Sequence, residues 1–336
     1  MPQVVRFHQL GGPEVLQVEE LPLQDPQAGE VRIKVQAIGL NRAEAMFRLG
    51  QYLEQPEFPS RLGIEAAGIV DAVGAGVMNV KAGDKVSVAT GQSIAEYGTY
   101  GEFAVVPAIS AVPYPANLTP EEAASVWVQY LTAYFAFVDM AGLKTGQSVL
   151  ITAATGGAGL GAIEMARILG ATSIATTRSA AKKDALLKAG ADHVIVGNEN
   201  FADRVKEVMG GKGAEVIFDP IAGDTLPILA ESVAWGGHII LYGALQGAQT
   251  AYPLWTAFLR NFTLQTYMVY NFTGLATLGL RRNEEAMARA VAFITQQLRE
   301  GRLKPRIDRT FPLAKIREAH AYMESNQQFG KIVVTV

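Results

Sequence analysis

Short apolar segments alternate with longer segments of helical periodicity between Ser148 and Tyr242. Short apolar strands separated by helices are typical of βαβ units, in which helices cover both faces of a parallel sheet. The chain is therefore expected to contain an α/β part with a doubly wound parallel sheet. Its strands are expected at 148–153, 173–177, 193–196, 216–219 and 238–242, with an edge strand at 263–269.

Residues 1–115 show a different pattern, in which short alternating segments are separated by glycine turns. This pattern predicts a small, irregular barrel or sandwich made of strands alone. The pattern changes at Thr119-Pro120-Glu121-Glu122, a capping box, and a single helix is expected from there to Ala141. After the edge strand, a helix at 284–300, a strand at 306–311, a helix at 314–325 and a strand at 331–336 are expected. A length of 336 residues fits two domains, and the three tryptophans are expected in their cores.

The charge balance excludes two classes of partner. The sequence has 29 Lys and Arg against 32 Asp and Glu, a net charge of -3, so it offers no positive field to a nucleic acid or an anionic membrane. The N-terminal residues lack the apolar core of a secretory signal, so a cytoplasmic location is expected. Between Ser232 and Leu280 only Arg260 carries a formal charge, but glycines and Pro253 interrupt the segment too often for a membrane span. We interpret this segment as core and subunit interface, and we expect a homodimer in which strand 263–269 extends the sheet across a two-fold axis.

Cysteine is absent from the sequence. Disulfides, thiolate nucleophiles, iron–sulfur clusters and every cysteine-based zinc site are therefore excluded.

A loop of small residues joins strand 148–153 to the next helix. Backbone amides at a helix N-terminus bind a pyrophosphate only where small side chains let the phosphates approach. We therefore expect a dinucleotide here, although a glycine-rich turn in any parallel α/β domain would look similar. The candidate cofactor-binding residues of the loop are Ala154, Gly156, Gly157, Ala158 and Gly159.

The end of strand 173–177 indicates which dinucleotide is bound. An acidic side chain at this place would bind the ribose 2′-hydroxyl of NADH, but the sequence reads Thr176-Thr177-Arg178-Ser179, with Lys182 one turn later. Arg178 and Lys182 can pair with a 2′-phosphate. Thr177, Arg178 and Lys182 therefore predict NADPH as the cofactor, and the alternative is that these basic residues are only the solvated start of a helix.

The assembled pattern resembles the medium-chain dehydrogenase/reductase superfamily, and within it the zinc-free quinone oxidoreductase branch. The similarity covers nearly the whole chain. Its motifs are Gly12-Pro13-Glu14-Val15-Leu16, Gly29-Glu30-Val31, Ala37-Ile38-Gly39-Leu40-Asn41, Arg48-Leu49-Gly50-Gln51-Tyr52, Pro59, Gly63, Glu65, Ala67-Gly68-Ile69-Val70, Gly83-Asp84-Lys85-Val86, Leu131-Thr132-Ala133-Tyr134 and Gly330-Lys331-Ile332-Val333.

This resemblance implies a GroES-like catalytic domain made of residues 1–119 and 272–336, a Rossmann dinucleotide-binding domain at 120–271, and an active site in the cleft between them. It also implies that Thr132, Gly243 and Lys331 contact the cofactor. In the zinc alcohol dehydrogenases of the superfamily, ligands stand where this chain has Asn41, Ile64 and a residue near Val128, so no zinc is expected. Where the family usually has Asp, this chain has Glu44.

The expected reaction is hydride transfer from NADPH to a quinone or to the β-carbon of an enone. Asn41 and Tyr52 are the candidate catalytic residues, as donors to the oxygen on which negative charge develops. Alternatives stay open at this stage: Tyr52 as an aromatic cover of the cleft, Asn41 as a turn residue or nicotinamide contact, and Thr132 as a hydroxyl bonded to its own helix.

Two other functions remain possible from the sequence. One is a reductase of enoyl thioesters within the same superfamily. The other is a dinucleotide-binding structural or regulatory protein without significant turnover. All three hypotheses, including reduction of quinones or enones, involve a small-molecule ligand.

Overall fold

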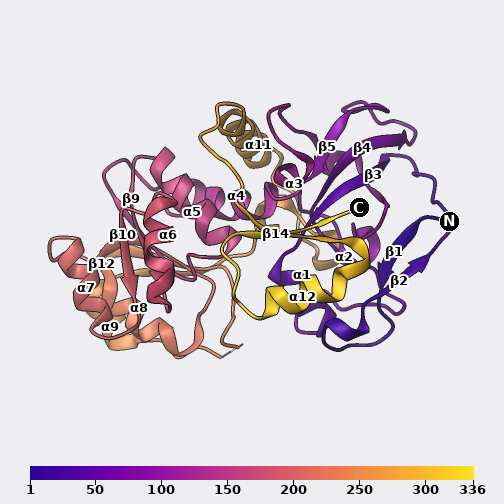
Figure 1. The fold of residues 1–336 in the computed structure, drawn as a ribbon. Coiled ribbons are helices and arrows are strands. Elements are labelled where there is room, and N and C mark those ends of the chain that lie inside the picture. The colour runs from indigo at the N-terminus through magenta and orange to yellow at the C-terminus, as the bar shows by residue number, and fades with distance from the viewer. Residues whose placement is uncertain (248) are drawn as a thin grey trace. The chain divides into compact units, whose positions relative to one another are not determined.

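The computed structural model describes residues 1–247 and 249–336, and the chain divides into two compact units (Figure 1). Unit 1 consists of Met1–Val128 and Tyr270–Val336, and unit 2 consists of Gln129–Val269. Unit 2 contains a parallel sheet and unit 1 a separate β-rich sheet, so the predicted fold class is confirmed. The compact units change after Val128 and before Tyr270, and the domain boundaries at 119/120 and 271/272 stay a prediction.

All strand pairs in the sheet of unit 2 are parallel. Numbered from the first strand, its order is that of the doubly wound dinucleotide-binding fold, with the order reversing between β8 and β11. β13 is the edge strand that the sequence predicts, but it ends three residues earlier than expected. From edge to edge the sheet consists of β10 (His193–Val196), β9 (Thr172–Thr177), β8 (Ser148–Ile151), β11 (Ala214–Asp219), β12 (Val233–Leu241) and β13 (Thr263–Thr266).

Helices separate the strands of unit 2. Aliphatic side chains such as Leu150, Ile174 and Ile217 are fully buried in its core, as expected for strands covered on both faces. The helical segments that separate these strands are α5 (Gly157–Ile168), η4 (Ala180–Lys182), α6 (Lys183–Lys188), α7 (Phe201–Val208), η5 (Gly223–Thr225), α8 (Leu226–Ser232) and α9 (Leu254–Arg260).

The main sheet of unit 1 joins the two ends of the chain. β15 (Lys331–Thr335) pairs antiparallel with β3 (Glu30–Gly39), so the last strand is built into a sheet of early ones. Its order is β14 (Ile307–Pro312), β15, β3, β4 (Ala66–Val73), β5 (Lys85–Val88) and β7 (Ala111–Pro113), with β6 (Phe103–Pro107) also paired to β3. β1 (Gln3–Arg6) and β2 (Gln17–Glu20) form a separate two-stranded sheet.

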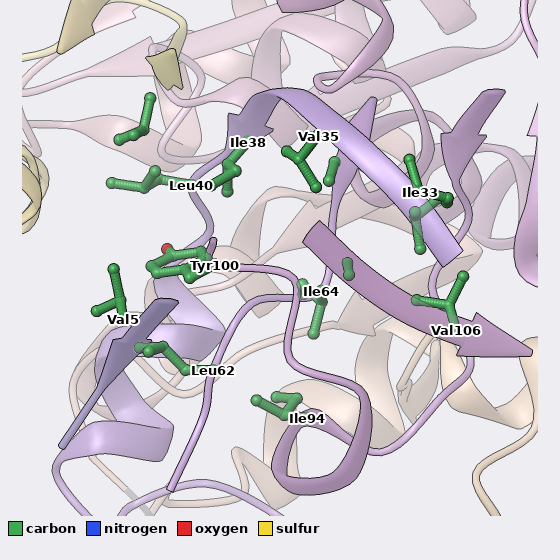
Figure 2. Packing of buried hydrophobic residues seen from close by; sticks show 14 of the residues in the cluster. Val5, Ile33, Val35, Ile38, Leu40, Leu62, Ile64, Ile94, Tyr100 and Val106 are labelled. Carbon is green, nitrogen blue, oxygen red and sulfur yellow. The ribbon is translucent and has the colours of Figure 1, made fainter. Parts of the chain in front are cut away.

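Side chains from β3, β6 and the loops around them fill the core of unit 1. Figure 2 shows Ile33, Val35 and Val106 packed in this core, with Tyr100 lying among aliphatic neighbours. Tyr100 is fully buried, so its hydroxyl needs a partner inside the protein.

The expectation that residues 1–115 form strands alone is wrong, because α1 (Arg42–Arg48) follows β3 directly. Its N-cap is Asn41, whose backbone N–H donates to the Glu44 carboxylate at 2.7 Å. The remaining helical segments of unit 1 are η1 (Pro13–Val15), α2 (Ile94–Tyr97), η2 (Ala108–Ser110), α3 (Pro120–Ala123), α10 (Tyr270–Thr273), η6 (Ala276–Leu278), α11 (Glu284–Arg299), η7 (Leu313–Lys315) and α12 (Ile316–Glu324).

The single helix expected over 120–141 is broken. The capping box of α3 forms as predicted, but the chain leaves the helix after Ala123 and resumes as α4 (Trp127–Tyr134), followed by a π-helical segment, η3 (Phe135–Met140). The Val128 N–H, in the first turn of α4, donates to Glu65 Oε1 at 3.1 Å. A residue distant in sequence therefore binds a backbone amide at this new helix start, where first-turn amides need a partner.

No helix in the described part of the chain is long and apolar enough to cross a membrane. The expectation that all three tryptophans lie in cores is wrong, because Trp127 is buried whereas Trp235 and Trp255 are exposed.

Candidate functional site

The loop after β8 presents backbone amides at the start of α5. Ala153 has a positive φ of 47°, which turns the chain sharply away from the strand, and Gly156 is the N-cap of the helix. The N–H groups of Gly157, Ala158 and Gly159 follow, and first-turn amides have no carbonyl partner within their own helix. The helix N-terminus is therefore suited to an anion.

Two glycines of this loop have different surroundings. A Cβ at Gly159 would lie 2.6 Å from Cα of Ala154 and 2.8 Å from its carbonyl oxygen, so only glycine lets α5 pack this closely on the turn. A Cβ at Gly156 would meet only the Ala153 oxygen, at 3.7 Å, so this side of the loop is open. An open cradle of backbone amides beside a tightly packed helix fits the pyrophosphate of a dinucleotide.

The place where the strand order of unit 2 reverses carries a second polar group. Thr152 Oγ1 donates to the Asp219 carboxylate, which also accepts the N–H groups of Ile221 and Ala222 at 3.2 and 2.7 Å. Burial raises the pKa of Asp219 above its ordinary value, although these hydrogen bonds act in the opposite direction. Nearby, Gly243 packs on Pro220, where a Cβ would lie 2.8 Å from the Pro220 oxygen. Its predicted cofactor contact stays a prediction.

The basic residues predicted to bind a 2′-phosphate lie at the carboxyl end of β9. Arg178 directly follows the strand, is exposed, and has no ion-pair partner within residues 1–247 and 249–336. Lys182 is the N-cap of α6 and is half-buried. The Thr177 hydroxyl accepts the Ser179 N–H at 3.2 Å, which fixes the turn between them. Arg178 thus has its guanidinium available for an anionic ligand.

The other two predicted cofactor contacts lie in different units. Thr132 is in α4, within unit 2, and is nearly buried. Lys331 is the first residue of β15, within unit 1, where its ammonium donates to Leu40 O at 3.0 Å, Asn41 Oδ1 at 2.7 Å and Glu65 Oε2 at 2.9 Å. All three donors of Lys331 are thereby used.

The structure brings Asn41, Glu65 and Lys331 together as one buried cluster. Asn41 Nδ2 donates to Gly39 O at 3.1 Å and to Glu65 Oε2 at 3.2 Å, while its Oδ1 accepts from Lys331. Both amide hydrogens of Asn41 are therefore used inside unit 1. A role for Asn41 as donor to a substrate oxygen stays a prediction, and it requires one of these two bonds to open.

This cluster does not fit a zinc ion. Of the three positions where zinc ligands were expected in relatives, Ile64 and Val128 carry no donor atom, and Asn41 offers only an amide oxygen that Lys331 already occupies. In the described residues, no three side chains of His, Asp or Glu lie close enough together to hold a metal. We therefore derive no step that uses a metal.

A second set of buried hydrogen bonds holds the start of α1. Glu44 accepts the Ile64 N–H at 3.1 Å and the Tyr100 hydroxyl at 2.6 Å, and the Tyr100 oxygen lies 3.1 Å from Nε2 of His320. Burial raises the pKa of Glu44 to about 7, and burial with the nearby Arg48 and Arg42 lowers the pKa of His320 to about 3. Neutral His320 therefore donates from Nε2 to Tyr100.

Tyr52 lies in the loop after α1, half-buried against the core of unit 1. Its hydroxyl donates to the Tyr270 hydroxyl at 3.4 Å. Burial, together with Tyr270, raises the pKa of Tyr52 well above 10, so it keeps its proton at neutral pH. Tyr52 is thus placed as a neutral hydrogen-bond donor.

The sequence analysis did not select Glu65, Tyr100, His320 or Tyr270 as site residues. Glu44 had a usable signal, because Asn41 followed three residues later by Glu44 is a capping-box pattern. The other contacts join residues far apart in the sequence, so spacing alone gives no signal for them.

Residues of both units are similar to known protein families. Residues 27–116 match the family of the alcohol dehydrogenase GroES-like domain, and residues 189–334 match a family described as zinc-binding dehydrogenase. The chain is 38% identical to quinone oxidoreductase 1 of Escherichia coli over 251 residues, which cover 74% of this chain and 75% of that protein. It is 31% identical to the rat synaptic vesicle membrane protein VAT-1 homolog over 335 residues, covering 96% of this chain and 81% of that protein.

The structure of Escherichia coli quinone oxidoreductase complexed with NADPH is also similar. It superimposes with a TM-score of 0.88 at 30% identity, and the match covers 99% of this chain and 100% of that one. The similarity therefore extends over both units.

Proposed function

The chain belongs to the medium-chain dehydrogenase/reductase superfamily as a quinone oxidoreductase-like protein, and from this premise we propose that it uses NADPH to reduce quinones or α,β-unsaturated carbonyl compounds without a metal. That it is an oxidoreductase follows from the family. The choice of NADPH, the class of acceptor and the independence from zinc are our proposal.

The observation that carries the proposal is the basic end of β9. Arg178 stands where an acidic residue would bind the ribose hydroxyls of NADH, and a 2′-phosphate would repel such an acid. Arg178 is exposed and has no ion-pair partner in the part of the chain that the structure describes, so a phosphate costs it no existing bond. In this proposal Arg178 and Lys182 bind the 2′-phosphate, and the amides of Gly157–Gly159 bind the pyrophosphate.

NADPH, when bound, supplies a hydride to an electron-poor carbon. What the acceptor then requires from the protein is a donor for the oxygen that gains negative charge. Tyr52 meets this requirement, because its raised pKa keeps the hydroxyl protonated. The cluster of Asn41, Glu65 and Lys331 holds the segment from which α1 and the Tyr52 loop follow.

Independence from zinc is supported by the donor set. The chain has no cysteine, and Ile64 and Val128 offer no ligand atom. Quinones and enones accept a hydride without a Lewis acid when a hydrogen-bond donor faces their oxygen, whereas an alcohol oxygen needs stronger polarisation.

The test is NADPH oxidation followed by absorbance with 1,4-benzoquinone, an enone and an enoyl thioester in parallel. We expect faster oxidation with the quinone or the enone than with the thioester, and slower oxidation when NADH replaces NADPH. If the thioester is the best acceptor, the enoyl-thioester hypothesis is right instead. Binding of NADPH without turnover of any acceptor would support the structural or regulatory hypothesis.

We also propose that two copies associate through unit 2. α9 exposes Trp255, Phe258 and Leu259 to 79%, 69% and 77%, and Trp235 near the start of β12 is 72% exposed. Exposed large apolar side chains on α9 and β12, together with the open edge of β13, support a two-fold contact. Light scattering is expected to give twice the 36.0 kDa of one chain, and Trp255→Glu should shift it toward the monomer.

A further inference from the structure

Tyr52 has a second tyrosine directly behind it. Tyr270, the first residue of α10, is almost fully buried, and its hydroxyl oxygen lies 3.4 Å from that of Tyr52. Both residues belong to unit 1, although they are far apart in the sequence. The sequence motif that contains Tyr52 does not extend to Tyr270.

A third hydroxyl completes this set. Thr90 is fully buried, and its Oγ1 makes no hydrogen bond of ordinary geometry with any described residue. It nevertheless lies near Tyr270, since it partly opposes the rise that burial causes in the pKa of that tyrosine. A buried hydroxyl without a good partner costs free energy, so its position needs a reason.

We propose that Tyr270 is a positioning residue for Tyr52, and that Thr90, Tyr270 and Tyr52 form a chain of hydroxyls directed at the acceptor oxygen. This inference rests on the proposed function, since it assigns the partner through which Tyr52 acts. A hydroxyl donates one hydrogen bond and accepts two, so all three can turn in the same direction. Thr90 then donates to Tyr270, Tyr270 donates to Tyr52, and Tyr52 donates to the substrate.

The charges around the pair keep the hydroxyls neutral. Glu54 is buried, and its two oxygens accept the Ile94 N–H at 2.9 Å and the Thr277 hydroxyl at 2.8 Å. Burial raises the pKa of both tyrosines, and the negative charge of Glu54 raises them further. The three hydroxyls transfer no proton to the substrate. They orient and polarise the Tyr52 O–H, since linked hydrogen bonds strengthen one another.

In the present arrangement Tyr52 donates to Tyr270, so its hydrogen points away from a substrate. A substrate oxygen next to Tyr52 reverses this bond by rotation of the two hydroxyls alone, with no movement of heavy atoms. With Phe at position 270, Tyr52 would keep its ring position and lose the donor behind it. The proposal therefore predicts an effect on rate and little effect on cofactor binding.

The experiment compares Tyr52→Phe, Tyr270→Phe and the double variant in NADPH oxidation with 1,4-benzoquinone. Removing a hydrogen bond to a developing charge is expected to lower kcat about tenfold or more in each single variant, with the KM for NADPH unchanged. Because both act through one hydroxyl chain, the double variant should be no slower than Tyr52→Phe. Thr90→Val should give a smaller loss in the same direction.

Tyr97→Phe is the matched control, because Tyr97 also lies in unit 1 and donates to a carboxylate, that of Glu30, at 3.1 Å. It should leave kcat unchanged. If Tyr270→Phe also leaves kcat unchanged, or if the losses of the single variants multiply in the double variant, the proposal is overturned.

Binding of 4-nitrophenolate separates this proposal from the proposed function, because it needs no turnover. Its oxyanion resembles the charge that a reduced quinone develops. We expect the wild-type chain to bind it and both phenylalanine variants to bind it more weakly. If both variants bind 4-nitrophenolate as tightly as the wild type, the role of Tyr270 is contradicted. If both bind it more weakly but the wild-type protein reduces no acceptor, only the proposed function is contradicted.

Discussion

Gly159→Ala tests the packing of the phosphate loop. The new Cβ would lie 2.6 Å from Cα and 2.8 Å from both C and O of Ala154, all of them backbone atoms that cannot rotate away. The start of α5 must then move outward, and overpacking of this kind costs about 1–3 kcal/mol. Alanine is the better helix former by about 1 kcal/mol, which offsets part of this cost. We expect a net loss of up to about 2 kcal/mol in the free energy of unfolding, which is the difference between these two magnitudes.

Gly156→Ala is the matched control within the same loop. Its Cβ would meet only the Ala153 oxygen, at 3.7 Å, so the fold has room for it. The loss of a glycine N-cap costs less than about 1 kcal/mol. The methyl group would nevertheless stand on the open side of the loop, where the pyrophosphate is expected. This variant should therefore remain nearly as stable as the wild type and bind NADPH more weakly.

Urea unfolding of the ligand-free variants measures stability, and fluorescence titration with NADPH measures affinity. Gly159→Ala is expected to lose both, and Gly156→Ala mainly affinity. Wild-type stability together with wild-type affinity in Gly159→Ala would contradict the close packing of α5 on Ala154. Wild-type affinity in Gly156→Ala would show that the phosphates bind elsewhere.

Three further predictions concern charge and metal. Arg178→Ala should raise the Kd for NADPH about 10–100-fold, because a hydrogen bond to a charged group contributes about 1.5–3 kcal/mol. Calorimetry should find the Kd for NADH unchanged in this variant, and the control Lys188→Ala should change the Kd for neither cofactor. Equal losses of affinity for both cofactors in Arg178→Ala would contradict the 2′-phosphate assignment. Burial raises the pKa of Glu44 from 4.5 to about 7, so between these pH values the folded chain keeps a proton that the unfolded chain has released. The protonated carboxyl therefore contributes about 3 kcal/mol to the free energy of unfolding. This contribution is fully present below pH 4.5 and is lost as the pH rises through about 7. Glu44→Gln should flatten that pH dependence in urea unfolding, and an unchanged slope would refute the assignment. Dialysis against EDTA should leave NADPH-dependent turnover unchanged, and a loss restored by zinc would contradict independence from metal.

The fold of unit 2 was accessible to sequence analysis because its signals are local. Apolar strands, helical periodicity and the small residues from Ala153 to Gly159 follow one another along the chain. The capping box at Thr119 and Glu122 also formed as predicted, since its partners lie three residues apart. In each case the residues that interact are neighbours in sequence.

The predictions from the sequence were wrong where contacts between distant residues decide the structure, or where a local pattern was not taken into account. The helix expected to reach Ala141 is broken before Trp127, and the new helix start is bound by Glu65 through the Val128 N–H, a contact that no local pattern shows. α1 was missed although Asn41 and Glu44 carry its capping signal, because the alternation around them was interpreted as strands alone. The exposed Trp255 was expected in a core because tryptophan is mostly buried, a preference that does not apply where a second chain can cover the residue.

The candidate site divides in the same way. The phosphate loop after β8 and the basic residues after β9 follow adjacent parallel strands, so they lie at the same edge of the sheet, and their contacts with a cofactor stay a prediction. The pairing of Tyr52 with Tyr270, and of Lys331 with Asn41 and Glu65, joins residues from opposite ends of the chain. Only the folded structure supplies these contacts.

Isotope transfer measures whether NADPH delivers its hydride directly to a carbon of the acceptor. NADPH carrying deuterium at the transferred position of C4 is incubated with the protein and an enone, and the reduced product is analysed by mass spectrometry. The account predicts one deuterium at the β-carbon of the product, with NADPH consumed in equal amount. A reduced product without deuterium, or formed equally well after the cofactor is left out, would contradict it.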